Sequence, residues 1–238
     1  MESEVAEKIY PILIVPESIR ELGPAESQSE EDAKKTFDWT MAVLKSRIDG
    51  LLEFFGVAYP MAGSEYPFLL DLGTKATAKL RREPHFRLTD NGAEPTAAGL
   101  SMAYDLGLLV GDLVIRAGGG AVRWMLQLEG NKKSLEYNKA VLSGRLGHLK
   151  IEPIRSSMAD ARLIVQGLDF QMMWAWNYAF WLVKLTSEVR LRPEETVSRA
   201  HALGFPLEDY RELSKREWAK ARKAGGPYLR RPTSPLPK

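Results

Sequence analysis

Two aspartates and an arginine in one stretch of chain have the residue types and spacing for acid–base chemistry. Asp112 and Arg116 stand four residues apart, a spacing at which side chains meet on a helix surface, and Asp105 lies seven residues before Asp112. Two carboxylates and an arginine on one face could exchange protons with a substrate. The favoured interpretation is structural, as a solvated face or an ion pair. A catalytic site would require a concave pocket at these residues.

The histidines and serines do not fall into a known catalytic or metal-binding spacing. The three histidines lie in separate segments, at His85, His148 and His201, and the HExxH motif is absent. No serine stands in a GxSxG context. The chain has no cysteine, which excludes disulfides, thiolate metal sites and cysteine nucleophiles. We expect no metal site and no cofactor.

The run Gly118-Gly119-Gly120 raises the question of a phosphate-binding loop. Such a loop needs the order strand, glycine loop, helix, because the helix N-terminus supplies free amides and the positive end of the dipole. Here the order is reversed, since a helix is predicted over 96–117 and a strand over 122–128. We therefore predict that these glycines only end the helix and turn the chain into the strand.

Acidic residues gather in the first quarter of the chain. The whole chain has a formal charge of +2, but residues 1–60 contain twelve acidic and only six basic residues. A negatively charged surface favours a basic partner. The candidate partner-binding residues are Glu30, Glu31, Asp32, Asp38, Asp49 and Glu53.

Basic residues dominate the C-terminal end, where residues 211–238 contain nine basic and two acidic residues. Interleaved with Trp218 and Tyr228, they could neutralise phosphates while the rings stack on bases. Trp218 could instead anchor this segment to the core, and the low net charge argues against a dedicated nucleic-acid binder. The candidate nucleic-acid-binding residues are Lys215, Arg216, Lys220, Arg222, Lys223, Arg230 and Arg231.

The acidic candidates lie on the clearest predicted helix, over 30–55. Ser29 stands at the N-cap position, three acidic residues follow it, and apolar residues recur at helical spacing from Phe37 to Phe55. Gly56 then ends the helix. A second helix is predicted over 64–82.

Two further segments are assigned from their prolines and turn residues. Residues 10–16, YPILIVP, are β-prone and bracketed by prolines, which predicts a short edge strand. Residues 83–95 contain two prolines and the pair Asn91-Gly92, which predict a loop or irregular segment.

The predicted helix over 96–117 contains an unusual ridge of small residues. Gly99, Ala103, Gly107 and Gly111 recur every four residues and therefore line one side of the helix. Each helical glycine costs about 1 kcal/mol relative to alanine. We therefore expect another helix or a sheet to approach this ridge closely.

The C-terminal half is predicted to be helical. A long helical segment over 159–188 carries aromatic residues on more than one face and is expected to break at Gly167. Its aromatic side chains could line a ligand pocket, although core packing is the favoured interpretation. Shorter helices are predicted over 194–203 and 206–223.

The central block follows the pattern LGxxxGxLxxR, then GG, then a strand with a tryptophan, then a polar YNK-type turn. The pattern is carried by Leu106, Gly107, Gly111, Leu113, Arg116, Gly119, Gly120, Trp124 and Asn138-Lys139. This block, about 40 of the 238 residues, resembles uncharacterised bacterial proteins often encoded beside polymorphic toxins, some of them called immunity proteins. It departs from their pattern in the third glycine and in the spacing before Trp124. The motif consists of packing residues, so the resemblance bears on fold more than on function.

These observations predict an α+β fold, in which a mainly helical single domain contains a small antiparallel sheet. Residues 1–210 would form that domain, and residues 211–238 a basic C-terminal helix and tail. No segment has the pattern of a signal peptide or the length of a membrane span, so we expect a cytoplasmic protein.

The leading functional hypothesis is a non-catalytic binding protein. The resemblance implies a bacterial immunity protein that neutralises a cognate toxin or effector by direct binding. The alternatives are a nucleic-acid-associated accessory protein acting through residues 211–231 and an enzyme centred on Asp105, Asp112 and Arg116.

Overall fold

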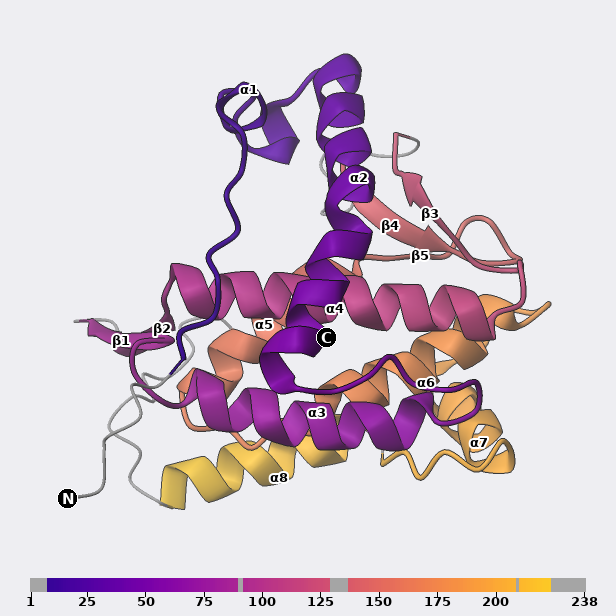
Figure 1. Ribbon diagram of the computed structural model, residues 1–238. Coiled ribbons are helices and arrows are strands. Elements are labelled where there is room, and N and C mark those ends of the chain that lie inside the picture. Colours follow the sequence, from indigo (N-terminus) through magenta and orange to yellow (C-terminus); the bar gives the residue numbers. More distant parts are fainter. Residues whose placement is uncertain (1–7, 90–91, 129–136, 209, 224–238) are drawn as a thin grey trace.

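The computed structural model describes residues 8–89, 92–128, 137–208 and 210–223, in which helices dominate (Figure 1). The α-helices of this part are α1 (Glu17–Arg20), α2 (Glu30–Phe55), α3 (Glu65–Leu80), α4 (Ala97–Ala117), α5 (Pro153–Val165), α6 (Met173–Thr186), α7 (Pro193–Ala202) and α8 (Tyr210–Lys223). One sheet pairs β1 (Phe86–Thr89) with β2 (Gly92–Pro95), and the other orders β3 (Arg123–Leu126), β4 (Ala140–Ser143) and β5 (Lys150–Ile151). Both are antiparallel, which confirms a mainly helical α+β single domain.

Helix α4 forms the centre of the molecule because it is apolar on nearly every side. Met102, Leu106, Leu109 and Leu113 are fully buried, and α4 contacts α2, α3, α5 and α6 as well as strands from both sheets. Within the described part of the chain, α4 alone is long and apolar enough to cross a membrane. However, 78% of that stretch is buried inside the protein, as in the core helix of a globular fold.

The small residues of α4 allow the close approach that their spacing predicted. A Cβ atom on Gly107 would lie 2.6 Å from the Cα atom of Ile154 in α5. A Cβ atom on Gly111 would lie 2.3 Å from the Trp124 indole of β3. A Cβ atom on Gly99 would lie 2.3 Å from the His85 carbonyl oxygen. The ridge therefore has three close neighbours, two of them backbone and one an aromatic ring, and each can approach because the glycine lacks a methyl group.

The triple glycine ends α4 and leads into β3, as predicted. Gly119 and Gly120 have φ angles of 56° and 83°, in the left-handed region that glycine adopts without steric cost. Strand β3 is shorter than the predicted 122–128 and pairs with β4, so that Trp124 stands opposite Leu142.

The N-terminal segment corrects one prediction, because residues 10–16 form no strand. Their amides bond to side chains instead: Tyr10 N donates to His85 Nε2 at 3.1 Å and Leu13 N to Ser101 Oγ at 2.8 Å. Two prolines, Pro11 and Pro16, have no N–H with which to extend a ladder. The segment is therefore held by its buried Tyr10 ring rather than by a sheet.

A hairpin forms where a loop was predicted. Phe86 of β1 pairs with Pro95 of β2, and the proline is tolerated because β2 is an edge strand of a two-stranded sheet. Ala93 is buried, and Phe86 packs against the hydrophobic core. Tertiary packing of these side chains therefore outweighs the local preference of a proline-rich segment for irregular structure.

The predicted helix over 159–188 is two helices, α5 and α6, and the break lies at Gly167 with a φ of 96°, as expected. Helix α5 begins earlier than predicted, at Pro153. Helix α6 is buried on most sides, in agreement with its all-round aromatic character. Helix α8 docks through the buried Leu213 and through Trp218, which packs on the core as the structural interpretation of that residue requires.

Candidate functional site

Helix α2 is longer than the body on which it packs. Its second half is anchored by the buried Ile48, Leu51 and Leu52. Its first half projects beyond the layer of α4, with α1 at the same end of the molecule (Figure 1). Ser29 caps the projecting end, where its hydroxyl accepts from the Asp32 amide at 3.1 Å.

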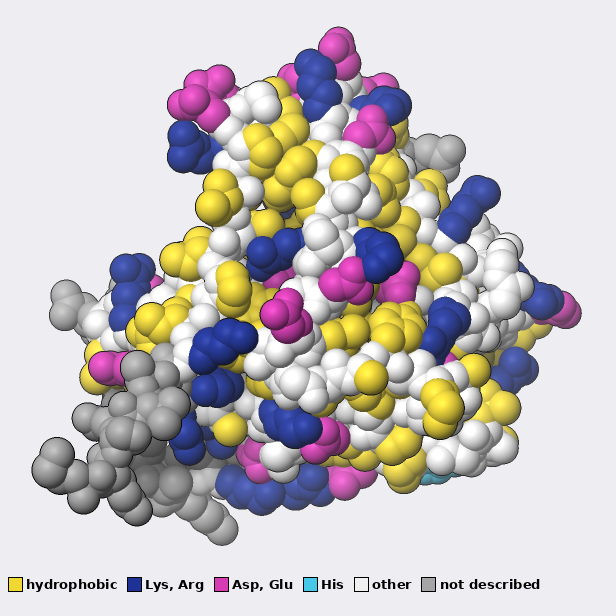
Figure 2. All heavy atoms as spheres, in the orientation of Figure 1, with side chains coloured by type: hydrophobic (Ala, Val, Ile, Leu, Met, Phe, Trp, Pro, Cys, Tyr) yellow, Lys and Arg dark blue, Asp and Glu magenta, His cyan; other side chains and the backbone are white. Residues whose placement is uncertain are grey.

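Apolar side chains continue along the projecting half of α2. Phe37 and Met41 follow the same helical stripe as Ile48, yet both are only half-buried and neither belongs to the hydrophobic core. Ile12 and Ile14, in the segment that leads to α1, are 55% and 85% exposed. Figure 2 shows hydrophobic side chains gathered on this part of the surface, with charged side chains around its tip. We refer to Ile12, Ile14, Phe37 and Met41 as the apolar arm.

The acidic candidates all reach solvent, but they form two groups. Glu30, Glu31, Asp32 and Asp38 lie on the projecting half of α2, whereas Asp49 and Glu53 lie on the half beside the body. Asp38 and Asp49 are separated by about 16 Å along the helix axis. Only the first group therefore borders the apolar arm.

Four of these six acids already pair with lysines one turn away. The pairs are Glu31 and Asp32 with Lys35, Asp38 with Lys34, and Asp49 with Lys45. Exposed helical pairs of this kind contribute little to stability, because solvent screens them. A basic partner could therefore displace the lysines at small cost.

The basic candidates that the structure describes are held by glutamates. Lys215 pairs with Glu212 at 2.7 Å, Arg216 with Glu208 at 2.7 Å and Lys220 with Glu217 at 2.8 Å. The other four candidates, Arg222, Lys223, Arg230 and Arg231, lie outside the described side chains. The described part of α8 is therefore largely neutralised by its own ion pairs.

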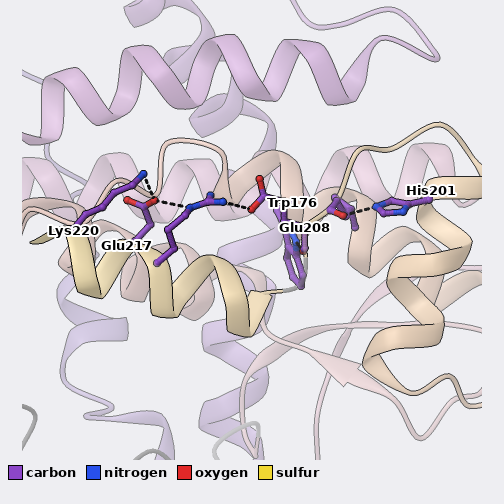
Figure 3. A network of polar contacts seen from close by, with 7 residues as sticks. Trp176, His201, Glu208, Glu217 and Lys220 are labelled. Carbon is purple, nitrogen blue, oxygen red and sulfur yellow. Dashed lines mark hydrogen bonds and ion pairs between the residues drawn. The ribbon is translucent and has the colours of Figure 1, made fainter.

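The pairs of Arg216 and Lys220 belong to a network of polar contacts that joins three helices (Figure 3). The Trp176 indole of α6 donates to the Glu208 carbonyl at 2.9 Å, and the His201 ring of α7 contacts the Leu207 carbonyl. The Glu217 carboxylate, 5% exposed, accepts from Lys220. This network ties α8 to the domain and accounts for its glutamates structurally.

The structure separates the three residues of the catalytic hypothesis. Asp105 is fully buried and accepts two hydrogen bonds from the Arg47 guanidinium, at 2.9 and 2.6 Å, and one from the Tyr10 hydroxyl. Burial raises the pKa of the Asp105 carboxyl, and the bond from Arg47 opposes that shift. A carboxylate held in this way is a structural ion pair, which contradicts a catalytic site centred on it.

The predicted pair between Asp112 and Arg116 does not form. Asp112 accepts from the Tyr59 hydroxyl. Arg116 reaches α3, where it bonds the buried Glu65 carboxylate at 2.8 Å and the Pro60 carbonyl at 2.8 Å. Pairing with Glu65 wins because an unpaired buried carboxylate would cost more than a lost surface pair.

The most unusual carboxylate was not singled out from the sequence. Asp160 of α5 is 7% exposed, and burial raises the pKa of its carboxyl to about 7. Among the described residues only Asn177 of α6 bonds it, at 3.0 Å. Asn177 is one of the polar residues that interrupt the apolar sequence of α6, and that interruption was the available signal.

The histidines have separate surroundings. His85 is buried and accepts from the Tyr10 amide, and His148 borders a surface pocket beside Lys184. Within the described residues, no three histidine, aspartate or glutamate side chains group as metal ligands would.

No family model, curated protein or solved structure matches this chain.

Proposed function

We propose that this chain is a non-catalytic binding protein whose protein partner docks on the apolar arm. The observation that carries the proposal is the partly exposed apolar stripe on the projecting half of α2, which lies outside the hydrophobic core, together with the exposed Ile12 and Ile14. Large apolar side chains held at the end of a projecting helix gain little for the fold, because they are not covered by the core. They would gain more by burial against a partner, at about 25 cal/mol per Å² of apolar surface.

The charges around the arm define the partner's chemistry. Glu30, Glu31, Asp32 and Asp38 border the apolar centre, an arrangement like the polar rim and apolar core of a protein interface. The fitting partner has an apolar patch bordered by lysine or arginine. Asp49 and Glu53 would contact it only if the interface extends along α2 to the body.

The partner's class comes from the resemblance of the central block to toxin-immunity proteins. We propose that the partner is a toxin or effector and that binding neutralises it.

The first experiment identifies what touches the arm. A photo-crosslinking amino acid is placed at Ile14 and, as a matched control, at Val189, an exposed apolar residue 53% accessible and outside the arm. We expect one protein to crosslink from Ile14 and not from Val189 in the native host. Equal crosslinking at both positions, or material removed by nuclease, would contradict the proposal and favour the nucleic-acid alternative.

The second experiment measures affinity for that purified partner. The double variant Glu31→Lys and Asp38→Lys should weaken binding at least about tenfold at low salt, because like charges then face each other. The matched control, Asp71→Lys on α3, should change the affinity less than about twofold. Unchanged binding by the double variant would refute the acidic rim. Loss of the partner's harmful activity at one equivalent of this protein would support the immunity role.

A further inference from the structure

A cavity of about 420 Å³ lies between α5, α6 and α7. Its volume falls within the range of small-molecule sites. Its walls are mainly apolar, with Ala159, Met173, Phe180 and Val197 among the lining residues. Its polar lining residues are Ser156, Asp160, Asn177 and Glu194. The Asp160 side chain is more than nine-tenths buried.

The Asp160 carboxylate has too few partners for a buried charge. One oxygen accepts from Asn177 Nδ2 at 3.0 Å. Among the described residues, no lysine, arginine or histidine forms an ion pair with it. A single neutral donor does not offset the cost of removing a carboxylate from water. The same loss of solvation raises the pKa of this carboxyl to about 7. A cation bound in the cavity would supply the missing partner.

The charged side chains around the cavity pair with groups other than the Asp160 carboxylate. Glu194, at the start of α7, lines the cavity and pairs with Arg192 at 3.4 Å. The Lys184 ammonium lies 5.2 Å from the centroid of the Phe180 ring and not against Asp160. In the part of the chain that the structure describes, the surroundings thus hold a second carboxylate, Glu194, and no cation paired with Asp160.

The aromatic wall is held rigid. The Trp176 and Phe180 rings stack with centroids 4.5 Å apart, and the Trp176 indole is fixed by its bond to the Glu208 carbonyl. A preformed wall of this kind lowers the entropic cost of binding a ligand.

We propose that this cavity binds a small organic cation, an ammonium group carried on an apolar body, with the ammonium against Asp160. The apolar body would lie along the wall formed by Met173, Phe180 and Val197. The proposal is independent of the partner-binding arm, because the arm lies on α2 and its neighbours, and the cavity lies among α5, α6 and α7.

The test compares two probes of the same shape, phenethylamine and 2-phenylethanol, by titration calorimetry at about pH 8, where the carboxyl is ionised. The full chain should bind the amine at least about tenfold more tightly than the alcohol. Asp160→Asn keeps the size and an acceptor for Asn177, and should remove that preference. Asp71→Asn on α3, where the carboxylate is exposed, should keep it. Equal binding of both probes, an amine preference that survives Asp160→Asn, or no amine binding at about 10 mM would overturn the proposal.

A second measurement does not depend on the variant's folding. The indole N–H resonance of Trp176 in the unaltered protein should shift on addition of phenethylamine, because this ring lines the cavity. Shifts confined to resonances of other tryptophans, such as Trp218 on α8, would place the amine elsewhere and refute the assignment.

Discussion

Replacing Asp160 by asparagine should make this protein more stable, and increasingly so as the pH rises. Burial raises the pKa of the Asp160 carboxyl from 3.8 to about 7 in the folded chain. Between these values the folded state holds a proton that the unfolded state has released. The stability contributed by this group therefore falls as the pH rises from about 4 to about 7 and stays low above that range.

The size of this change in the free energy of unfolding follows from the pKa shift of the Asp160 carboxyl. Three pKa units correspond to about 4 kcal/mol of stability, of which about 3 kcal/mol lies between pH 5 and pH 8. Asparagine does not ionise and can still accept from Asn177, so the variant avoids this loss. The other ionisable groups, including Glu194 at the same cavity, are present in both proteins and cancel in the comparison.

Urea denaturation of both proteins, followed by tryptophan fluorescence at about pH 5 and pH 8, measures the effect. The gain in unfolding free energy from Asp160→Asn should be larger at pH 8 by about 3 kcal/mol. A gain that is the same at both pH values would mean that the carboxyl has an ordinary pKa and is well solvated. A variant less stable than the parent at pH 8 would mean that its charge is needed by the fold, and either result would refute the reasoning.

Further substitutions test the packing. Gly107→Ala should lower the free energy of unfolding by about 1–3 kcal/mol, because the new methyl group meets the backbone of α5, and the melting temperature should fall with it. Its control, Gly50→Ala on α2, has nothing within 4 Å and should raise stability by up to about 1 kcal/mol. Asp105→Asn should cost about 3–5 kcal/mol by urea denaturation, since Arg47 loses its buried charge partner, and a loss below about 1 kcal/mol would contradict that pair. Leu213→Ala should cost about 2–5 kcal/mol, and a neutral result would show that α8 is not part of the cooperative core.

The helices could be predicted because their signals are local. Ser29, the acidic first turn and Gly56 fix the ends of α2 with little help from the rest of the chain. The glycines of α4 predicted a close neighbour correctly, since a methyl group at Gly107 would clash with the backbone of α5. The glycine spacing does not identify the neighbour, because that depends on which distant segments of the chain pack against α4.

The two errors in the extended segments have one physical cause. Residues 10–16 have strand propensity but take their hydrogen bonds from His85 and Ser101, which are distant in sequence. Residues 86–95 have weak propensity but gain from burying Ala93 and from packing Phe86 on the core. Strand formation depends on partners that a local pattern does not contain.

Charge patterns predicted exposure but not pairing. The acids of α2 are at the surface as expected. The spacing of Asp112 and Arg116 suggested a pair, but Arg116 instead serves the buried Glu65 on another helix. A buried carboxylate competes for a cation more strongly than an exposed one, and burial is not visible in a spacing of four.

Glu65 and Asp160 are two buried carboxylates with different partners in this fold. Both are buried, but Glu65 has an arginine at 2.8 Å, whereas the donor to Asp160 among the described side chains is the Asn177 amide. Packing alone does not explain why a chain would keep a charge at Asp160, since asparagine would fill the same space at lower cost. A bound cation removes that cost whenever it is present. The stability difference between aspartate and asparagine at pH 8 should therefore narrow as phenethylamine is added, because only the parent binds it tightly.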